Sequence, residues 1–253
     1  MKLNPMEQFA VKPIGPEWHL PYHYFTLAFT NQALWMSIVV GAASLFMLVA
    51  VSNLRLVPGR LQSTAELAYE FVANMIVQAA GEDGLVFFPF VFTIFVFVLF
   101  SNFFGLLPGA FTVTSQIAVT FALACLVILT VIVTGFAVHG IGFLKLFVPH
   151  APLLLLFLLV PIEIISFLTR PISLSVRLFA NMLAGHTMLA VFGGFVILLG
   201  GAGGILTALA IAPMFLIVAI TALEILVAFL QAYVFAILTC IYLNEALHLH
   251  EQH

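Results

Sequence analysis

Apolar residues are grouped into long blocks along this chain, and polar residues are confined to the gaps between them. Uncharged blocks cover residues 33–51, 85–107 and 116–138, and Pro108 and Gly109 lie in the gap between the last two. At a rise of about 1.5 Å per residue, each block is long enough to cross about 30 Å of hydrocarbon as a helix. The pattern therefore predicts three ordinary transmembrane helices.

Residues 61–80 follow a different pattern, because apolar side chains recur there at helical spacing opposite polar ones. Glu66 and Glu70 lie on the polar side, and the order Ser63-Thr-Ala-Glu66 is typical of a capping box at a helix start. A helix of this kind is too polar to cross the membrane, so we expect it to lie at the membrane interface or against other subunits.

Residues 151–199 and 205–247 form two longer apolar segments, joined by the glycine-rich residues 200–204. As a continuous helix, each segment would be roughly 65–75 Å long, which is more than twice the hydrocarbon thickness. Each segment therefore contains either two spans or one long, steeply tilted helix.

A hairpin about the glycine-rich turn brings polar residues of the two segments to equal depth. In such a hairpin, the position numbers of two residues at equal depth add up to about the same total for every pair. By this rule Arg177 is level with Gln231, and His186 is level with Glu224. The turn lies about 40 Å of helix beyond Arg177, whereas only about 15–20 Å of membrane depth is available, which favours the tilted hairpin. The expected fold is an all-α integral membrane protein with about three ordinary transmembrane helices, an interfacial amphipathic helix and a long, strongly tilted two-helix hairpin.

The composition indicates that this protein lies in a lipid bilayer. Apolar residues make up 64% of the 253 residues and charged residues 7%, whereas an ordinary soluble domain carries about 25% charged residues. This excludes a soluble enzyme, a disordered chain and a nucleic-acid binder. Cys125 and Cys240 lie in separate apolar blocks without metal-ligand spacing, and we expect both to be buried small apolar residues.

The distribution of basic residues predicts the orientation. Arg55 and Arg60 follow the first span and Lys145 follows the third, so the positive-inside rule places the N-terminus outside and the C-terminus inside. The absence of a repeat of 20–50 residues weighs against transporters built from duplicated halves. The expected organisation is a polar N-terminal segment at 1–30, a single membrane domain at 31–247 and a short tail at 248–253.

Ionisable residues inside apolar segments are the main functional candidates, because each costs at least about 2.5–3.5 kcal/mol at the centre of a bilayer. They are Glu163, Arg170, Arg177, His186 and Glu224. The alternative is a structural ion pair or a side chain reaching the interface, and for Arg170 both interpretations stay open. The hairpin also levels Glu163 with Glu245.

Arginine keeps its proton in proteins, whereas histidine and glutamate can exchange theirs. A fixed central charge beside the titrating residues His186 and Glu224 indicates a gated proton path. No carboxylate of this chain is level with Arg177. The carboxylate that carries the proton past Arg177 is therefore expected in another protein.

Three motifs resemble subunit a of F-type ATP synthases. Arg177-Leu-Phe-Ala-Asn181-Met-Leu-Ala-Gly185-His186 is similar to its arginine-centred signature, and Glu224 followed by Gln231-Ala-Tyr-Val-Phe is similar to its last helix. Asn102-Phe-Phe-Gly-Leu-Leu-Pro108 resembles its second-span motif. The resemblance covers residues 31–245 and is to the proton-translocating, alphaproteobacterial and mitochondrial-like type.

The resemblance implies a role for each candidate residue. Arg177 would face the carboxylates of a rotating ring of c subunits and separate two half-channels. The outer half-channel would contain Asn181, His186, Glu224 and Gln231, and the inner one Glu163. Loading and unloading of the ring would drive ATP synthesis elsewhere in the complex, so this subunit would not itself be catalytic.

The resemblance also implies the partners and the location. The partners would be the c-subunit ring, b-type peripheral stalk subunits, the rest of the F0F1 complex, the lipid bilayer and protons, with no nucleic acid, cofactor or metal. The membrane would be the bacterial inner membrane, with the mitochondrial inner membrane as the alternative. Two competing functions are a haem- or quinone-associated anchor of a respiratory complex and a secondary transporter. Haem held by two histidines disagrees with His186 being the one histidine deep in an apolar segment.

Overall fold

A computed structural model describes residues 9–15, 18–19, 26–52, 55–107, 109–147 and 153–248. Most of the N-terminal segment expected at 1–30, Pro108 and the tail residues 249–253 lie outside the described residues. The chain forms two compact units. The first comprises Met1–Phe46, Phe97–Gln116 and Leu178–Gln231, and the second Met47–Val96, Ile117–Arg177 and Ala232–His253. The organisation into a single membrane domain with terminal segments stays a prediction.

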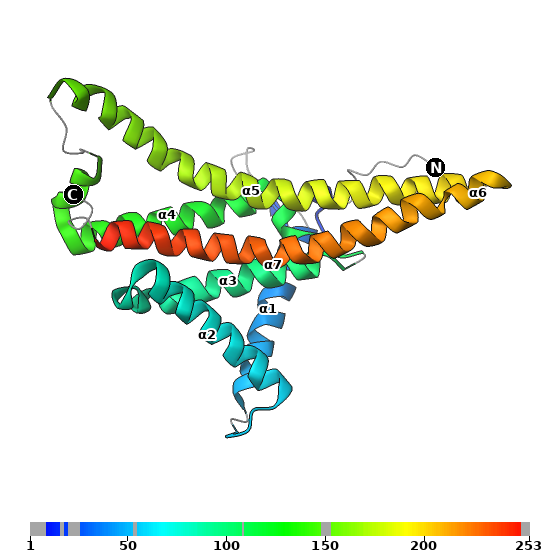
Figure 1. Cartoon of the computed structure of the whole chain (residues 1–253), viewed down its shortest axis with the longest axis horizontal. Coiled ribbons are helices and arrows are strands. Elements are labelled where there is room, and N and C mark those ends of the chain that lie inside the picture. The colour runs from blue at the N-terminus through cyan, green and yellow to red at the C-terminus, as the bar shows by residue number, and fades with distance from the viewer. Residues whose placement is uncertain are drawn as a thin grey trace. The chain divides into compact units, whose positions relative to one another are not determined.

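Helices occupy the three uncharged blocks, labelled in Figure 1 as α1 (Asn31–Ser52), α3 (Phe88–Gly105) and α4 (Ile117–His139). Short 3-10 helices precede α3 (η2, Glu82–Phe87) and α4 (η3, Val113–Ser115). A third, η4, follows α4 at Gly140–Phe147. Two-residue strands at Trp18–His19 (β1) and Thr26–Leu27 (β2) pair antiparallel, which the sequence pattern did not predict.

The amphipathic helix α2 runs from Arg60 to Ala80 and buries Val72, Met75 and Ile76. The capping-box prediction is wrong. Ser63 lies inside the helix, where its N–H donates to the carbonyl of Gly59 at 2.8 Å. The extended backbone of Gly59 already starts the helix there, so the Ser63 side chain has no end to cap.

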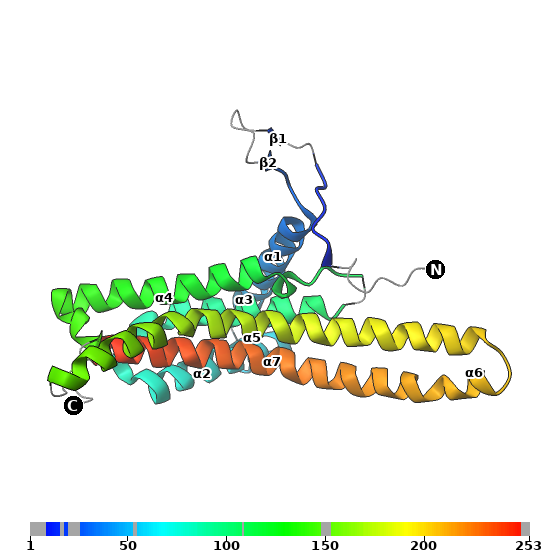
Figure 2. The ribbon, with the colours of Figure 1, turned by 90° about the horizontal axis from the view of Figure 1, so that it is seen from above.

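The two long apolar segments form α5 (Leu153–Gly201), α6 (Ile205–Leu209) and α7 (Ile211–Leu247). Helix α5 is continuous over 49 residues, which favours one long helix over two separate spans in the first of these segments. The second segment is interrupted at Ala210, because Pro213 has no N–H to donate to the carbonyl four residues before it, that of Leu209. Within the first unit, the later part of α5 and the first part of α7 lie side by side in Figures 1 and 2 and are joined through α6.

The described helices include five that are long and apolar enough to cross a membrane. They lie at Asn31–Ser52, Glu82–Gly105, Ile117–Leu144, Leu155–Gly201 and Thr207–Leu247. The protein is therefore an all-α integral membrane protein, as the sequence predicts. The tilt of the long helices and the interfacial position of α2 stay predictions.

Each of the two units buries polar as well as apolar residues. In the second unit, α2 packs on α3 through Tyr69 and Phe88, whose ring centroids are 4.4 Å apart, and His139 of α4 bonds the carbonyl of Leu247 at 3.0 Å. The buried polar residues of the first unit are Ser101, Asn102, Thr112, Thr114, Ser115, Glu224 and Gln231. Cys240 is buried as expected, but Cys125 is exposed on α4.

Candidate functional site

A cavity of about 350 Å³ lies within the first unit and contains both titrating candidates, His186 of α5 and Glu224 of α7. Phe9, Thr112 and residues of the turn after α3 complete much of its wall. Polar walls of this kind can hold water, which an apolar cavity of similar size does not. The structure thus brings together the two residues that the hairpin arithmetic places at equal depth.

Glu224 is buried, with 8% of its surface exposed, and its carboxylate lies against the backbone of Gly185. A Cβ atom added to Gly185 would be 2.1 Å from Oε1 and 3.0 Å from Cδ of Glu224. Glycine at this position therefore provides the space that the carboxylate occupies. Among the described residues, Oε2 of Glu224 has no hydrogen-bond partner. A buried carboxylate without a partner is costly when ionised, so this oxygen is suited to carry a proton or to be hydrated from the cavity.

His186 is positioned by two elements outside α5. Its Nε2 lies 3.2 Å from Oγ1 of Thr112, and its ring meets the ring of Phe9 edge-on at a centroid distance of 6.4 Å. The Thr112 hydroxyl can donate to a neutral imidazole or accept from it, so the contact is compatible with either state of that nitrogen. The hydroxyl also lies 3.5 Å from the carbonyl of Gly105.

A chain of buried hydrogen bonds connects this corner to α7. Asn102 is fully buried, donates through Nδ2 to the carbonyl of Ala228 at 3.2 Å and accepts from the Thr114 hydroxyl at 2.9 Å. The Ser115 hydroxyl donates to the carbonyl of Thr112 at 2.6 Å. Thr112 and Thr114 are site residues that were not predicted from the sequence. The signal was present, because residues 112–116 are a polar run within an otherwise apolar part of the chain.

The other predicted residues are distributed over both units. Gln231 is buried on α7 and Asn181 is exposed on α5, both in the first unit. Arg177 is exposed and Glu163 half-buried, both on the α5 portion that belongs to the second unit. None of these four residues lines the cavity.

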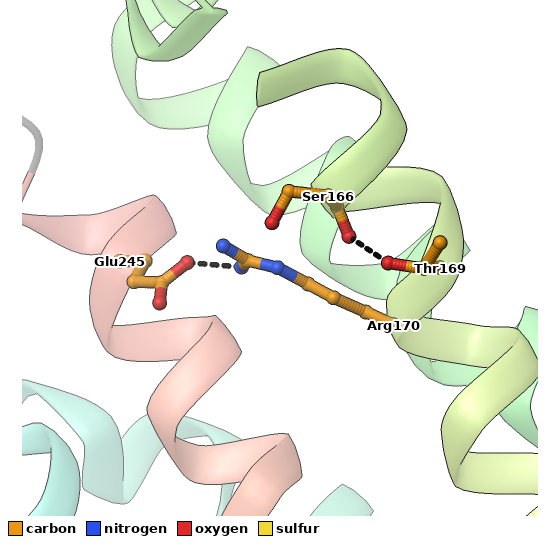
Figure 3. Close-up of polar contacts among 4 residues, drawn as sticks. All are labelled: Ser166, Thr169, Arg170 and Glu245. Atoms are coloured by element: carbon orange, nitrogen blue, oxygen red, sulfur yellow. Dashed lines mark hydrogen bonds and ion pairs between the residues drawn. The ribbon is translucent and has the colours of Figure 1, made fainter. Parts of the chain in front are cut away.

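Arg170 forms an ion pair with Glu245 in the second unit, as Figure 3 shows. The guanidinium carbon also lies 5.6 Å from the centroid of the Phe167 ring and 5.1 Å from that of the Tyr242 ring. This is the structural ion pair that the sequence left open for Arg170. Glu245 therefore pairs with Arg170, which lies seven positions after Glu163. The hairpin had placed Glu163 itself at the depth of Glu245. In the described part of the chain, Glu163 forms no ion pair.

The site contains side chains that can exchange protons, because a buried carboxylate, an imidazole and a hydroxyl lie around one cavity. Among the described residues, there is no group of three His, Cys, Asp or Glu side chains that could hold a metal ion.

Known proteins are similar to this chain over almost its whole length. The sequence model of the family described as ATP synthase A chain matches residues 33–244. The chain is 58% identical over 248 residues to ATP synthase subunit a of Mesorhizobium japonicum, covering 98% of this chain and 97% of that protein. It is 56% identical over 249 residues to ATP synthase subunit a of Agrobacterium fabrum, covering 98% and 99%. For ATP synthase subunit a of Beijerinckia indica the identity is 53% over 251 residues, covering 98% and 97%.

Proposed function

This chain belongs to the ATP synthase A chain family, and on that premise we propose how it moves protons. It is the proton-channel stator subunit of the F0 sector, an integral multi-pass protein of the bacterial inner membrane. The haem-anchor and transporter alternatives are not favoured by the family match. It is a membrane subunit that is not itself catalytic, and ATP is made elsewhere in the F0F1 complex.

The outer half-channel leads through the cavity that His186 and Glu224 share. The observation that carries this proposal is the buried Glu224 carboxylate, which lines a cavity together with His186 and Thr112 and has one oxygen without a hydrogen-bond partner among the described residues. Protons enter from outside, exchange at His186 and Glu224 and pass along a path that includes Asn181 and Gln231. They then neutralise a carboxylate of the c-ring.

Arg177 separates the two half-channels as a charge that cannot be discharged. An ionised ring carboxylate cannot enter lipid because of its desolvation cost, whereas a protonated one can. The ring therefore turns only with loaded sites, and each proton leaves through an inner half-channel that contains Glu163. Moving each charge across the membrane contributes about 2.3 kcal/mol per 100 mV.

Two partners follow from this mechanism. The c-ring supplies the carboxylates that are loaded, and b-type peripheral stalk subunits keep this chain from turning with the ring. The exposed Arg177 on α5 supports a partner surface along that helix. Protons and the lipid bilayer complete the working environment.

Proton flux in inverted membrane vesicles tests the proposal. We expect Arg177→Ala to abolish coupled ATP synthesis while the complex still assembles on native gels. Glu224→Gln should strongly reduce proton conduction, because the amide cannot exchange the proton. Glu70→Gln, which changes an exposed glutamate of α2, is the matched control and should conduct like the wild type. Full coupling in Arg177→Ala would contradict the separation of the half-channels, and wild-type conduction in Glu224→Gln would contradict the outer path.

A further inference from the structure

Two large apolar side chains in the turn between α1 and α2 are exposed. Leu56 is fully exposed and Val57 is 83% exposed, although both are large hydrophobic residues. The turn follows α1, a helix apolar enough to cross the membrane, so we infer that it lies where the hydrocarbon ends. Apolar side chains at this depth can insert into the acyl region of one leaflet.

Arg55 and Arg60 flank these side chains, and both line a cavity of about 380 Å³ within the second unit. No described residue forms an ion pair with either guanidinium group. The nearby Glu66 accepts a hydrogen bond from Gln62 at 2.8 Å. The described lining of the cavity contains these two arginines and no acidic residue, and the cavity volume lies within the range of about 300–1,000 Å³ that is usual for small-ligand sites.

The backbone around the cavity is held in place and offers further donors. Gln62 is buried and bonds Arg55 twice, accepting from its N–H and donating to its carbonyl, each at 3.2 Å. The first N–H groups of α2 have no partner within the helix, and Gly59 before them has no side chain to cap them. Such N–H groups bind phosphate well, and arginine binds it through paired hydrogen bonds.

We propose that this turn is a binding site for the phosphate headgroup of an anionic phospholipid. Arg55, Arg60 and the start of α2 bind the phosphate, and Leu56 and Val57 insert beside the acyl chains. Free phosphate shares the headgroup chemistry, but it gives no reason for two exposed apolar side chains between the arginines. The lipid accounts for both features.

Photocrosslinking in the intact ATP synthase complex tests this site. The probe is phosphatidylglycerol with a photoreactive acyl chain, in detergent micelles that also contain phosphatidylcholine, and labelling is measured on the peptide 55–62. We expect Arg55→Gln and Arg60→Gln each to reduce labelling about fivefold, the change that corresponds to about 1 kcal/mol per basic residue at an anionic surface. Lys12→Gln, which removes an exposed positive charge elsewhere, is the control and should leave labelling unchanged.

Two further measurements need no charge-removing variant. A phosphatidylcholine probe with the same acyl chain should label the wild-type peptide at least about fivefold less. Excess inorganic phosphate should not displace the phosphatidylglycerol label. Equal labelling by the two probes, or undiminished labelling of the Arg55→Gln and Arg60→Gln variants, overturns the proposal. Displacement by inorganic phosphate would assign the site to free phosphate and make the lipid proposal wrong. Proton conduction does not enter these readouts, so they are independent of the proposed function.

Discussion

Glu224 occupies space that only glycine at position 185 leaves open. The carboxylate would overlap a Cβ atom at that position, although the two residues lie on different helices and 39 positions apart. The position of this acid therefore depends on a neighbour without a side chain.

Alanine at position 185 is expected to displace the carboxylate from the cavity. We expect Gly185→Ala to reduce proton conduction about ten- to a hundredfold, the range seen when a reacting group is misplaced by about 1 Å. The matched control is Gly193→Ala on the same helix, where an added Cβ meets nothing within 4 Å. The control should conduct normally and gain about 0.5–1 kcal/mol of helix stability. Similar proton flux in the two variants would show that Gly185 does not position Glu224.

At this scale, the sequence could predict which titrating residues lie at equal depth but not which groups they contact. The sums of position numbers paired His186 with Glu224, because a hairpin constrains depth. They could not identify Thr112 as the partner of His186 at 3.2 Å, because that contact depends on how the turn after α3 folds back. The ion pair of Arg170 with Glu245 required knowledge of side-chain direction as well as level.

Among the elements, Asn102 connects the end of α3 to α7 and to the polar run that holds His186. Its two hydrogen bonds, to Ala228 and Thr114, are fully buried. We expect Asn102→Ala to cost about 1–3 kcal/mol, because it leaves buried groups without partners. Hydrogen exchange in residues 109–116 should accelerate, while Asn74→Ala on the exposed side of α2 should leave it unchanged. Unaltered exchange in Asn102→Ala would contradict this role.

The pair Arg170 and Glu245 connects α5 with α7 in the second unit. Both side chains are partly exposed, at 19% and 24%, so we expect a coupling of only about 1 kcal/mol. A double-mutant cycle with Arg170→Gln and Glu245→Gln, read by hydrogen exchange in residues 240–247, measures this coupling. Additive effects of the two substitutions would show that the pair contributes nothing to holding the helices together.

The lengths of the apolar blocks predicted where the helices lie. The errors in the predicted helix ends came from local chemistry. Pro108 and Gly109 correctly indicated that α3 ends nearby, since it ends at Gly105. Pro213 interrupts the second long segment at Ala210, because the carbonyl of Leu209 lacks a donor. Ser63 satisfied a capping pattern that the extended Gly59 made unnecessary.

For the whole molecule, five crossings would place the two ends of the chain on opposite membrane faces. The basic residues after the first span predict that the N-terminus lies outside. An epitope attached before Met1 should therefore be cleaved by protease in spheroplasts, and one attached after His253 only in inverted vesicles. Cleavage of both epitopes from the same face would contradict five crossings, and the reverse pattern would contradict the orientation.

Composition alone established the membrane, and the depth arithmetic predicted the long helices of the last hundred residues. A helix of the length of α5 would extend about 70 Å, so it must tilt strongly to stay within the bilayer. The division into two compact units was not predictable from apolar blocks, because α5 and α7 each contribute residues to both.

The space shared by Gly185 and Glu224 also constrains how this family can diverge. A substitution at position 185 that adds a side chain either displaces the Glu224 carboxylate or requires a shorter group at position 224. In an alignment of close relatives they should therefore covary in size, although 39 residues separate them in the chain. Variation at one position is expected to appear together with a compensating change of volume at the other.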